Sequence, residues 1–256
     1  MQQIRQEIGV IIKSSQEIAI SREAGRLVAA VIDALNREVK PGVTTRELDD
    51  VAVRVLKKRG AIASFKGYRG FPASICTSVN EEVVHGIPGA RVLKAGDIIS
   101  LDVGAMVNGF HADAAVTLGV GKISSDAQGL IETTKGALEA GIAAARNGAR
   151  LGDVSAAIQS YAESRNFSVV REYVGHGIGR DLHEDPQVPN FGIAGEGILL
   201  KKGMTMALEP MLNAGVWRTK VTDNRWTVVT ADGKLSAHFE HTIAIADSVP
   251  EILTVL

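Results

Sequence analysis

Residues 99–119 read ISLDVGAMVNGFHADAAVTLG, and the fold of this part of the chain can be predicted from this stretch. Apolar residues dominate on both sides of Asn108-Gly109, a dipeptide typical of two-residue β-hairpin turns because both positions accept a positive φ. Placing the turn there pairs Val107 with Phe110. The segment therefore predicts two long antiparallel strands joined by a tight turn.

Two acids fall on one face of this predicted hairpin. The register sets Asp102 opposite Ala115 and Asp113 opposite Gly104. Side chains alternate along a strand, so the two carboxyl groups point the same way, and as diagonal neighbours they lie about 7 Å apart at the backbone. A solvated outer face would also explain them, but their neighbours are largely apolar: Ile98, Leu101, Val103, Ala114, Ala115 and Val116. Two acids in such surroundings indicate a bound divalent cation.

Three further metal-binding side chains lie in apolar, strand-like segments. His176 lies between glycines in YVGHGIG, Glu209 lies in GMTMALEPM, and Glu240 lies in SAHFEHTIAIA with Thr242 on the same face. Taken singly, each is a weak signal, because a lone buried histidine is more often a core residue and a lone strand glutamate is often exposed. Together with the two aspartates they supply four carboxylates and one imidazole, which is a ligand set for two bridged metal ions.

The other histidines are less informative. His85 in VVHGIPG and His183 in RDLHEDP lie in segments bounded by glycine or proline, where a further candidate metal ligand and a surface loop histidine are equally consistent. His111 and His238 lie beside the predicted ligand strands but have no distinguishing feature. We assign a role to neither of the last two.

The rest of the chain alternates helical and β-rich stretches. Capping boxes at Ser14/Glu17 and Thr44/Glu47 begin two amphipathic helices, over 14–38 and up to Gly60. A β-rich region at 73–121 follows, then helices at 125–146 and 153–164 and strands at 168–178, 203–209, 226–230 and 235–246. This repeated order predicts an α+β fold with a duplicated half. We expect a single catalytic domain over residues 1–256, with halves of about 1–122 and 123–256.

Charge and composition exclude several classes of protein. The 28 basic and 29 acidic residues leave a net charge of -1, which gives no basis for capture of nucleic acid or an anionic membrane. Cys76 is the only cysteine, so no internal disulfide is expected, and a reducing cytoplasm fits. The apolar run from Ile8 to Ile12 is too short for a signal peptide. No apolar stretch approaches the roughly 18 residues of a membrane span.

Seven motifs follow one another from about residue 20 to residue 245: SREAGRL, VKPGVTTRELD, NEEVVHGIPG, LDVGAMVNGFHADAAVT, GHGIGRDLHEDPQVPNFG, ALEPM and FEHT. In this order they resemble type I methionine aminopeptidases in their minimal bacterial form. The resemblance implies the pita-bread fold, in which a pseudo-twofold axis relates two α+β halves around a central antiparallel sheet. The duplicated element order agrees with that expectation.

The resemblance also implies roles for particular residues. The implied metal ligands are Asp102, Asp113, His176, Glu209 and Glu240. The implied catalytic residues are His85, His183 and Glu209, and the implied substrate-binding residues are His85, His183, Tyr68, Phe71, Cys76 and Trp226. The sequence departs from the family pattern at Phe65 (small in some members), Leu182 (aromatic in many) and His238 (commonly Gln). These departures concern the shape of the pocket.

The parts together predict a reaction. Two divalent ions (Co, Mn, Fe(II) or Zn) would hold a water or hydroxide between them, and the second ion would bind the free α-amine of the substrate. Glu209 would accept a proton, His183 would stabilise the carbonyl oxygen, and His85 would act on the leaving nitrogen. We therefore expect a cytoplasmic, monomeric aminopeptidase that removes the N-terminal methionine from nascent polypeptides when the second residue is small.

Two other functions remain open from the sequence. A proline-specific aminopeptidase or a creatine hydrolase could use the same fold, although the proline-specific relatives usually carry an extra N-terminal domain. A metal-free binding protein is the second alternative, but such a protein would have lost ligands, and all five positions are filled here. The sequence leaves open the physiological metal and any contact with the ribosome.

Overall fold

Two pairs of helices frame the structure, a computed structural model that describes residues 9–256. They are α2 (Ser15–Glu38), α3 (Thr45–Lys58), α4 (Ser125–Ala144) and α5 (Leu151–Glu163), with a short 3₁₀ helix, η1 (Tyr68–Gly70). Residues 1–8, which include the start of the N-terminal apolar run, lie outside the described residues. Among the described residues, no helix combines the length and the apolar character needed to cross a membrane.

Both predicted capping boxes are present. The Glu17 backbone N–H donates to Ser14 Oγ at 3.3 Å, and the Ser14 N–H donates to the Glu17 carboxylate at 3.0 Å. Thr44 and Glu47 form the same reciprocal pair at the start of α3. Each box satisfies backbone N–H groups that a helix start leaves without partners, so both helices begin where the sequence predicts. The four predicted helices are confirmed, with ends that differ by a residue or two.

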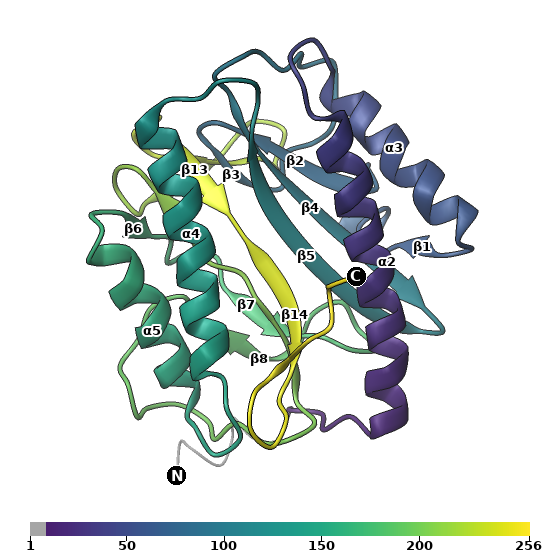
Figure 1. The fold of residues 1–256 in the computed structure, drawn as a ribbon, viewed down its shortest axis with the longest axis vertical. Coiled ribbons are helices and arrows are strands. Elements are labelled where there is room, and N and C mark those ends of the chain that lie inside the picture. The colour runs from purple at the N-terminus through teal and green to yellow at the C-terminus, as the bar shows by residue number, and fades with distance from the viewer. Residues whose placement is uncertain (1–8) are drawn as a thin grey trace.

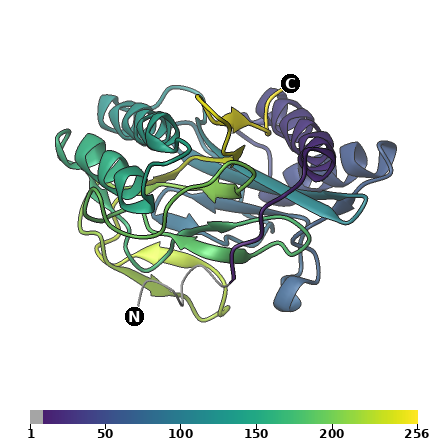
Figure 2. The same ribbon diagram turned by 90° about the horizontal axis from the view of Figure 1, so that it is seen from below.

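One large antiparallel sheet crosses the molecule (Figure 1). Its strands are β1 (Ile62–Ala63), β2 (Ile75–Val79), β4 (Ile98–Val107), β5 (Phe110–Gly119), β7 (Gly175–Gly177), β8 (Glu184–Val188), β9 (Thr205–Leu208), β14 (Glu240–Ala244) and β15 (Glu251–Ile252). They run in the order β1-β4-β5-β14-β9-β7-β8, with β2 paired to β4 and β15 paired to β14. The four α-helices gather on one side of this sheet (Figure 2). The predicted α+β class with a central antiparallel sheet is confirmed.

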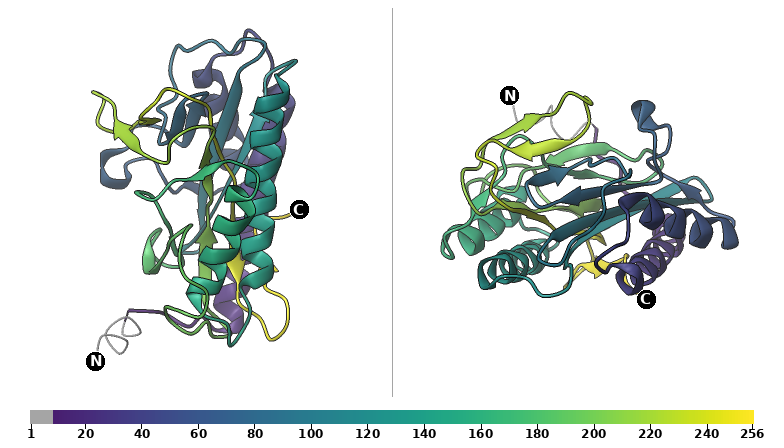
Figure 3. Two further views of the ribbon diagram at one scale, coloured as in Figure 1. Left: turned by 90° about the vertical axis from the view of Figure 1, so that its left-hand side faces the viewer. Right: turned by 90° about the horizontal axis from the view of Figure 1, so that it is seen from above.

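Two smaller sheets complete the fold. One has the order β13 (Ser236–His238), β10 (Met211–Asn213), β6 (Ser168–Val169), and the other β11 (Thr219–Val221), β12 (Val228–Thr230), β3 (Glu82–Val84). Figure 3 shows β11 and β12, coloured yellow-green, on the side of the molecule away from the helices. Trp226 lies in the connection between these two strands, and His85 directly follows β3. The second small sheet thus supports two predicted site residues.

The hairpin register predicted from Asn108-Gly109 is confirmed. Both turn residues have a positive φ, 48° and 78°, as a two-residue turn of this kind requires. Asp102 lies opposite Ala115 and Asp113 lies opposite Gly104. The two acids therefore share a face of the large sheet, as the alternation of side chains predicts.

Two strands predicted as continuous are interrupted, and the predictions of 168–178 and 235–246 as single strands are wrong. The first consists of β6 and β7, and the second of β13 and β14. In both cases the chain leaves a small sheet and joins the large one: β6 and β13 pair with β10, whereas β7 and β14 pair with β9. A change of partner sheet breaks the ladder, and no local sequence pattern reports it.

The apolar face of the hairpin identifies the side on which the site lies. Leu101 and Val103 belong to a buried cluster with Val28 and Leu35 of α2. Asp102, between them in sequence, must point to the opposite face of the sheet. A second buried cluster joins α4 and α5 to β9 and β14. The helices thus bury one face of the sheet and leave the acids on the other.

Candidate active site

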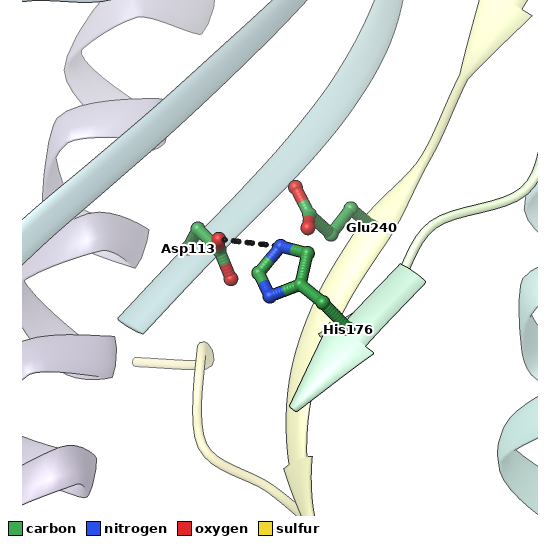
Figure 4. A group of neighbouring side chains, drawn as sticks. All are labelled: Asp113, His176 and Glu240. Atoms are coloured by element: carbon green, nitrogen blue, oxygen red, sulfur yellow. Dashed lines mark ion pairs between the residues drawn. The ribbon is translucent and has the colours of Figure 1, made fainter. Parts of the chain in front are cut away.

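Three side chains from three strands of the large sheet converge on one point (Figure 4). Asp113 comes from β5, Glu240 from β14 and His176 from β7, and one potential ligand atom of each lies within 4.8 Å of the others. Strand order explains the meeting, because β14 lies beside β5 and only β9 separates it from β7. His176 Nε2 lies 3.6 Å from Asp113 Oδ2, the pair joined by the dashed line in Figure 4. These donors could hold a metal ion.

The two other predicted ligands border this group. Glu209 directly follows β9, and its Oε1 lies 3.6 Å from His176 Nε2. Asp102 lies on β4 opposite Ala115, and Glu240 lies opposite the same alanine from the other side. Cross-strand partners share a face, so Asp102 and Glu240 point to the same side of the sheet. All five predicted ligands line a single cavity.

The cavity concentrates negative charge. Burial, followed by mutual repulsion, raises the pKa of Asp102, Glu209 and Glu240 well above the ordinary range, and burial raises the pKa of Asp113. Within residues 9–256, the only ion-pair partners of these four acids are histidines. The buried Asp102 Oδ1 has no hydrogen-bond partner in this part of the chain. An unpartnered oxygen among uncompensated acids fits a bound divalent cation, which would keep the carboxylates ionised.

Two neighbouring side chains hold Asp113 and Glu209 in place. Thr242 Oγ1 lies 2.9 Å from Asp113 Oδ1 and accepts the Asp113 backbone N–H at 3.0 Å. The buried Asn190 side chain donates through Nδ2 to the backbone carbonyl of Glu209 at 3.1 Å. The Thr242 hydrogen bond holds the Asp113 carboxylate in one direction, and the Asn190 hydrogen bond holds the backbone from which Glu209 projects.

The predicted catalytic histidine His183 lies beside the five potential ligands. Its ring centroid is 4.2 Å from that of His176, and its ring stacks on Tyr68 at 5.2 Å with an interplanar angle of 21°. Loss of hydration and the neighbouring His176 and Arg69 lower the pKa of His183 to about 3. The ring is therefore neutral at neutral pH and can donate a single N–H.

His85 reaches the same cavity from the small sheet. Its backbone has a φ of 60°, uncommon for a residue with a side chain, and its ring packs edge-on against Tyr173 at 5.8 Å. Gly86 explains the tight path of the chain, because a Cβ there would lie 2.1 Å from the backbone oxygen of Thr77. Burial lowers the pKa of His85 to about 4, so this ring is also neutral.

An apolar wall closes the cavity beside the acids. All four predicted pocket residues contribute to it, together with the two departures that lie nearby: Tyr68, Phe71, Cys76, Trp226, Phe65 and Leu182. Phe71 and Trp226 meet edge to face at 5.1 Å, a favourable aromatic geometry. Burial and the neighbouring Asp102 raise the pKa of Cys76, so its thiol remains neutral and apolar in character.

Comparison with known proteins identifies the family. The sequence matches the profile of metallopeptidase family M24 over residues 19–247. The chain belongs to metallopeptidase family M24. Methionine aminopeptidase 1 of Bacillus subtilis is 57% identical over 245 residues, which cover 96% of this chain and 99% of that protein. A crystal structure of methionine aminopeptidase from Thermotoga maritima has a TM-score of 0.95 at 46% identity, covering 96% of this chain and 100% of that one. The predicted resemblance to this family is confirmed.

A more distant structure shows how far the M24 fold extends. Prolidase from Pyrococcus furiosus has a TM-score of 0.77 at 19% identity and covers 99% of this chain but 67% of its own. At this identity the likeness concerns the fold alone. Together with the Thermotoga maritima structure, it confirms the pita-bread fold predicted from the motifs.

Some residues of this M24 site were not identified from the sequence. Arg69 lines the cavity, and its φ of 49° within the Gly67–Gly70 turn is a feature that no local pattern predicts. His238, to which the sequence assigned no role, is buried with its Nε2 3.9 Å from Glu209 Oε2. Asn190, which bonds the backbone carbonyl of Glu209, lies in a different loop, 19 residues earlier in the chain. His111, by contrast, bonds Ser64 Oγ at 2.8 Å and does not line the cavity.

Proposed function

We propose that this M24 metallopeptidase removes the N-terminal methionine from newly made proteins and prefers a small second residue. The observation that carries the proposal is the presence in one cavity of five potential metal donors and an apolar wall that includes Tyr68, Phe71 and Trp226. The relatives named methionine aminopeptidase, which match over nearly the full length of both chains, support the same reaction.

We assign the five donors to two divalent cations. Asp113 and Glu240 would be shared between them, His176 and Glu209 would complete one site, and Asp102 would complete the other. When bound, the cations would acidify a water molecule and hold the free α-amine of the substrate. Carboxylate and imidazole donors admit Co, Mn, Fe(II) or Zn.

The side chains around this centre would carry the proton transfers. Glu209 would accept a proton from the water whose oxygen forms the new bond to the scissile carbonyl carbon. The neutral His183 would donate an N–H to the carbonyl oxygen as that atom gains negative charge. His85 would deliver or position the proton that reaches the leaving nitrogen as the C–N bond breaks. The products would be free methionine and a chain shortened by one residue.

The shape of the pocket leads to a test of substrate choice. An aromatic slot suits an unbranched, polarisable thioether better than a branched side chain. We expect Met-Ala-Ser to be cleaved with a kcat/KM about 10- to 200-fold above that of Leu-Ala-Ser, the range that one small change in an apolar side chain can produce. Met-Lys-Ser should be cleaved much more slowly than Met-Ala-Ser. Equal rates on those two peptides would contradict the proposal, and a preference for Xaa-Pro peptides would indicate the proline-specific activity instead.

The donor assignment predicts two metal affinities. The site that includes His176 has four protein ligands and the site that includes Asp102 has three, and the second cation also binds beside an existing positive charge. Calorimetric titration of metal-stripped protein should therefore show a tight and a weak step. Asp102→Ala should retain the tight step, and His176→Ala should weaken it. A single step of equal affinity, or loss of the tight step in Asp102→Ala alone, would overturn the assignment.

The proposed substrates also bear on where and how the enzyme acts. New polypeptides present their N-termini in the cytoplasm, so we assign the enzyme to that compartment, with nascent chains as partners and the ribosome as a candidate docking surface. We also propose that the enzyme acts as a monomer. The residues with an assigned role line one cavity. They come from both halves of residues 1–256, which supports one catalytic domain.

A further inference from the structure

A buried ion pair lies outside the donor set described above. Lys13 lies next to Ser14, the N-cap residue of α2, and its Nζ pairs with Glu184 Oε2, with 2% and 4% of the two side chains exposed. The ammonium also donates to the Ile11 carbonyl at 3.2 Å, and the Lys13 backbone N–H donates to the Gly203 carbonyl at 2.8 Å. Lys13 is therefore held through both its backbone and its side chain. A buried lysine requires such compensation, since an unpaired charge there is strongly unfavourable.

Glu184, the partner of Lys13, ends the turn that carries His183. It is the first residue of β8 and lies opposite Gly177 of β7, so residues 178–183 form the connection between the two strands. Its second oxygen, Oε1, accepts the Asp181 backbone N–H at 3.3 Å. The Glu184 carboxylate, at the end of the turn, thus binds both the Lys13 ammonium and the backbone N–H of Asp181 in the middle of the turn.

The ion pair also fills the space against the turn. A Cβ at Gly179 would lie 2.5 Å from Glu184 Oε1 and 2.6 Å from Lys13 Cε, so both members of the pair pack directly on the backbone of that residue. On its other side, the Gly179 carbonyl accepts the His111 backbone N–H at 2.7 Å. The path of the turn is therefore fixed between β5 and the segment before α2.

We infer that Lys13 is a positioning residue for His183, acting through Glu184 and the 178–183 turn. The inference rests on the proposed function, in which His183 stabilises the carbonyl oxygen during peptide hydrolysis. The ring contacts with Tyr68 and His176 orient the imidazole, but they do not fix the backbone from which it projects. The buried ion pair does so, and a donor must be held to within a fraction of an ångström to be effective.

The test replaces Lys13 with methionine, which keeps the apolar stem on Gly179 and removes the ammonium. We expect kcat on Met-Ala-Ser to fall on the order of 10- to 100-fold, the effect of a displacement of about 1 Å at a catalytic group. KM and metal content should change little. In the His183→Ala background the same substitution should leave kcat unchanged, because the residue that it positions is gone. Lys135→Met, at an exposed lysine of α4 with 64% of its side chain accessible, is the matched control.

Each result separates the inference from the proposed function. An unchanged kcat in folded Lys13→Met, or an equal fall in both backgrounds, would overturn the positioning role. Failure of the wild type to cleave Met-Ala-Ser, or full activity of His183→Ala, would instead refute the proposed function or the role of His183. If Lys13→Met does not fold, Glu184→Gln replaces it in the same cycle, since it keeps the size and a hydrogen-bond acceptor while removing the charge. The same dependence on His183 is expected for that variant, and its absence would overturn the inference.

Discussion

Replacing Glu209 with glutamine should lower kcat on Met-Ala-Ser by about 10²- to 10⁴-fold, the usual contribution of a positioned general base. Glu209 Oε1 lies 3.6 Å from His176 Nε2, and the acid lines the cavity beside the apolar wall. Glutamine keeps the size of the side chain and leaves the Asn190 hydrogen bond to the backbone carbonyl of residue 209 in place, but it cannot accept a proton from water. The loss should therefore appear in kcat with little change in KM.

The measurement must separate the lost base from lost metal, because Glu209 is also a proposed ligand. Activity is measured at rising metal concentration until it no longer increases, and the bound metal is quantified at that point. Glu139→Gln, at an exposed glutamate of α4, provides the control for the chemical change alone. A fully loaded Glu209→Gln enzyme that retains its rate within a few-fold would refute the role as base.

His183→Ala should lower kcat by about 10²- to 10³-fold, the effect of removing one hydrogen-bond donor from a developing oxyanion. The neutral ring lies 4.2 Å from His176 between centroids, close to the proposed reaction centre without being an assigned ligand. Metal stoichiometry should therefore match that of the wild type. Loss of a metal ion in His183→Ala would show that the residue is a ligand.

A comparison of His85→Ala with His183→Ala distinguishes the chemical roles of the two histidines. If His85 acts on the leaving nitrogen, its removal should matter less for a methionine anilide with an electron-poor leaving group, which departs without full protonation. His183→Ala should slow the anilide and the peptide alike, since both develop charge on the carbonyl oxygen. The opposite pattern would exchange the two assignments.

Local patterns predicted a large part of this fold. The Asn108-Gly109 turn predicted the hairpin register residue by residue, because a two-residue turn leaves no freedom in the pairing that follows it. The capping boxes predicted where α2 and α3 begin for a similar reason, since a side chain and a backbone N–H three residues apart satisfy each other. The same register places Asp102 and Asp113 on one face of the hairpin, because side chains alternate along a strand.

The sequence by itself therefore determined the four α-helices, the central hairpin with its acid pair and, through ordered motifs, the family. Only the tertiary structure decided that β14 lies between β5 and β9, which brings Glu240 and His176 to Asp113, and that Lys13 reaches Glu184. It also decided where the chain changes sheets, as at Phe239 between β13 and β14. The physical reason is the range of the interactions: turns and caps act within a few residues, whereas strand order and buried ion pairs depend on how the whole chain packs.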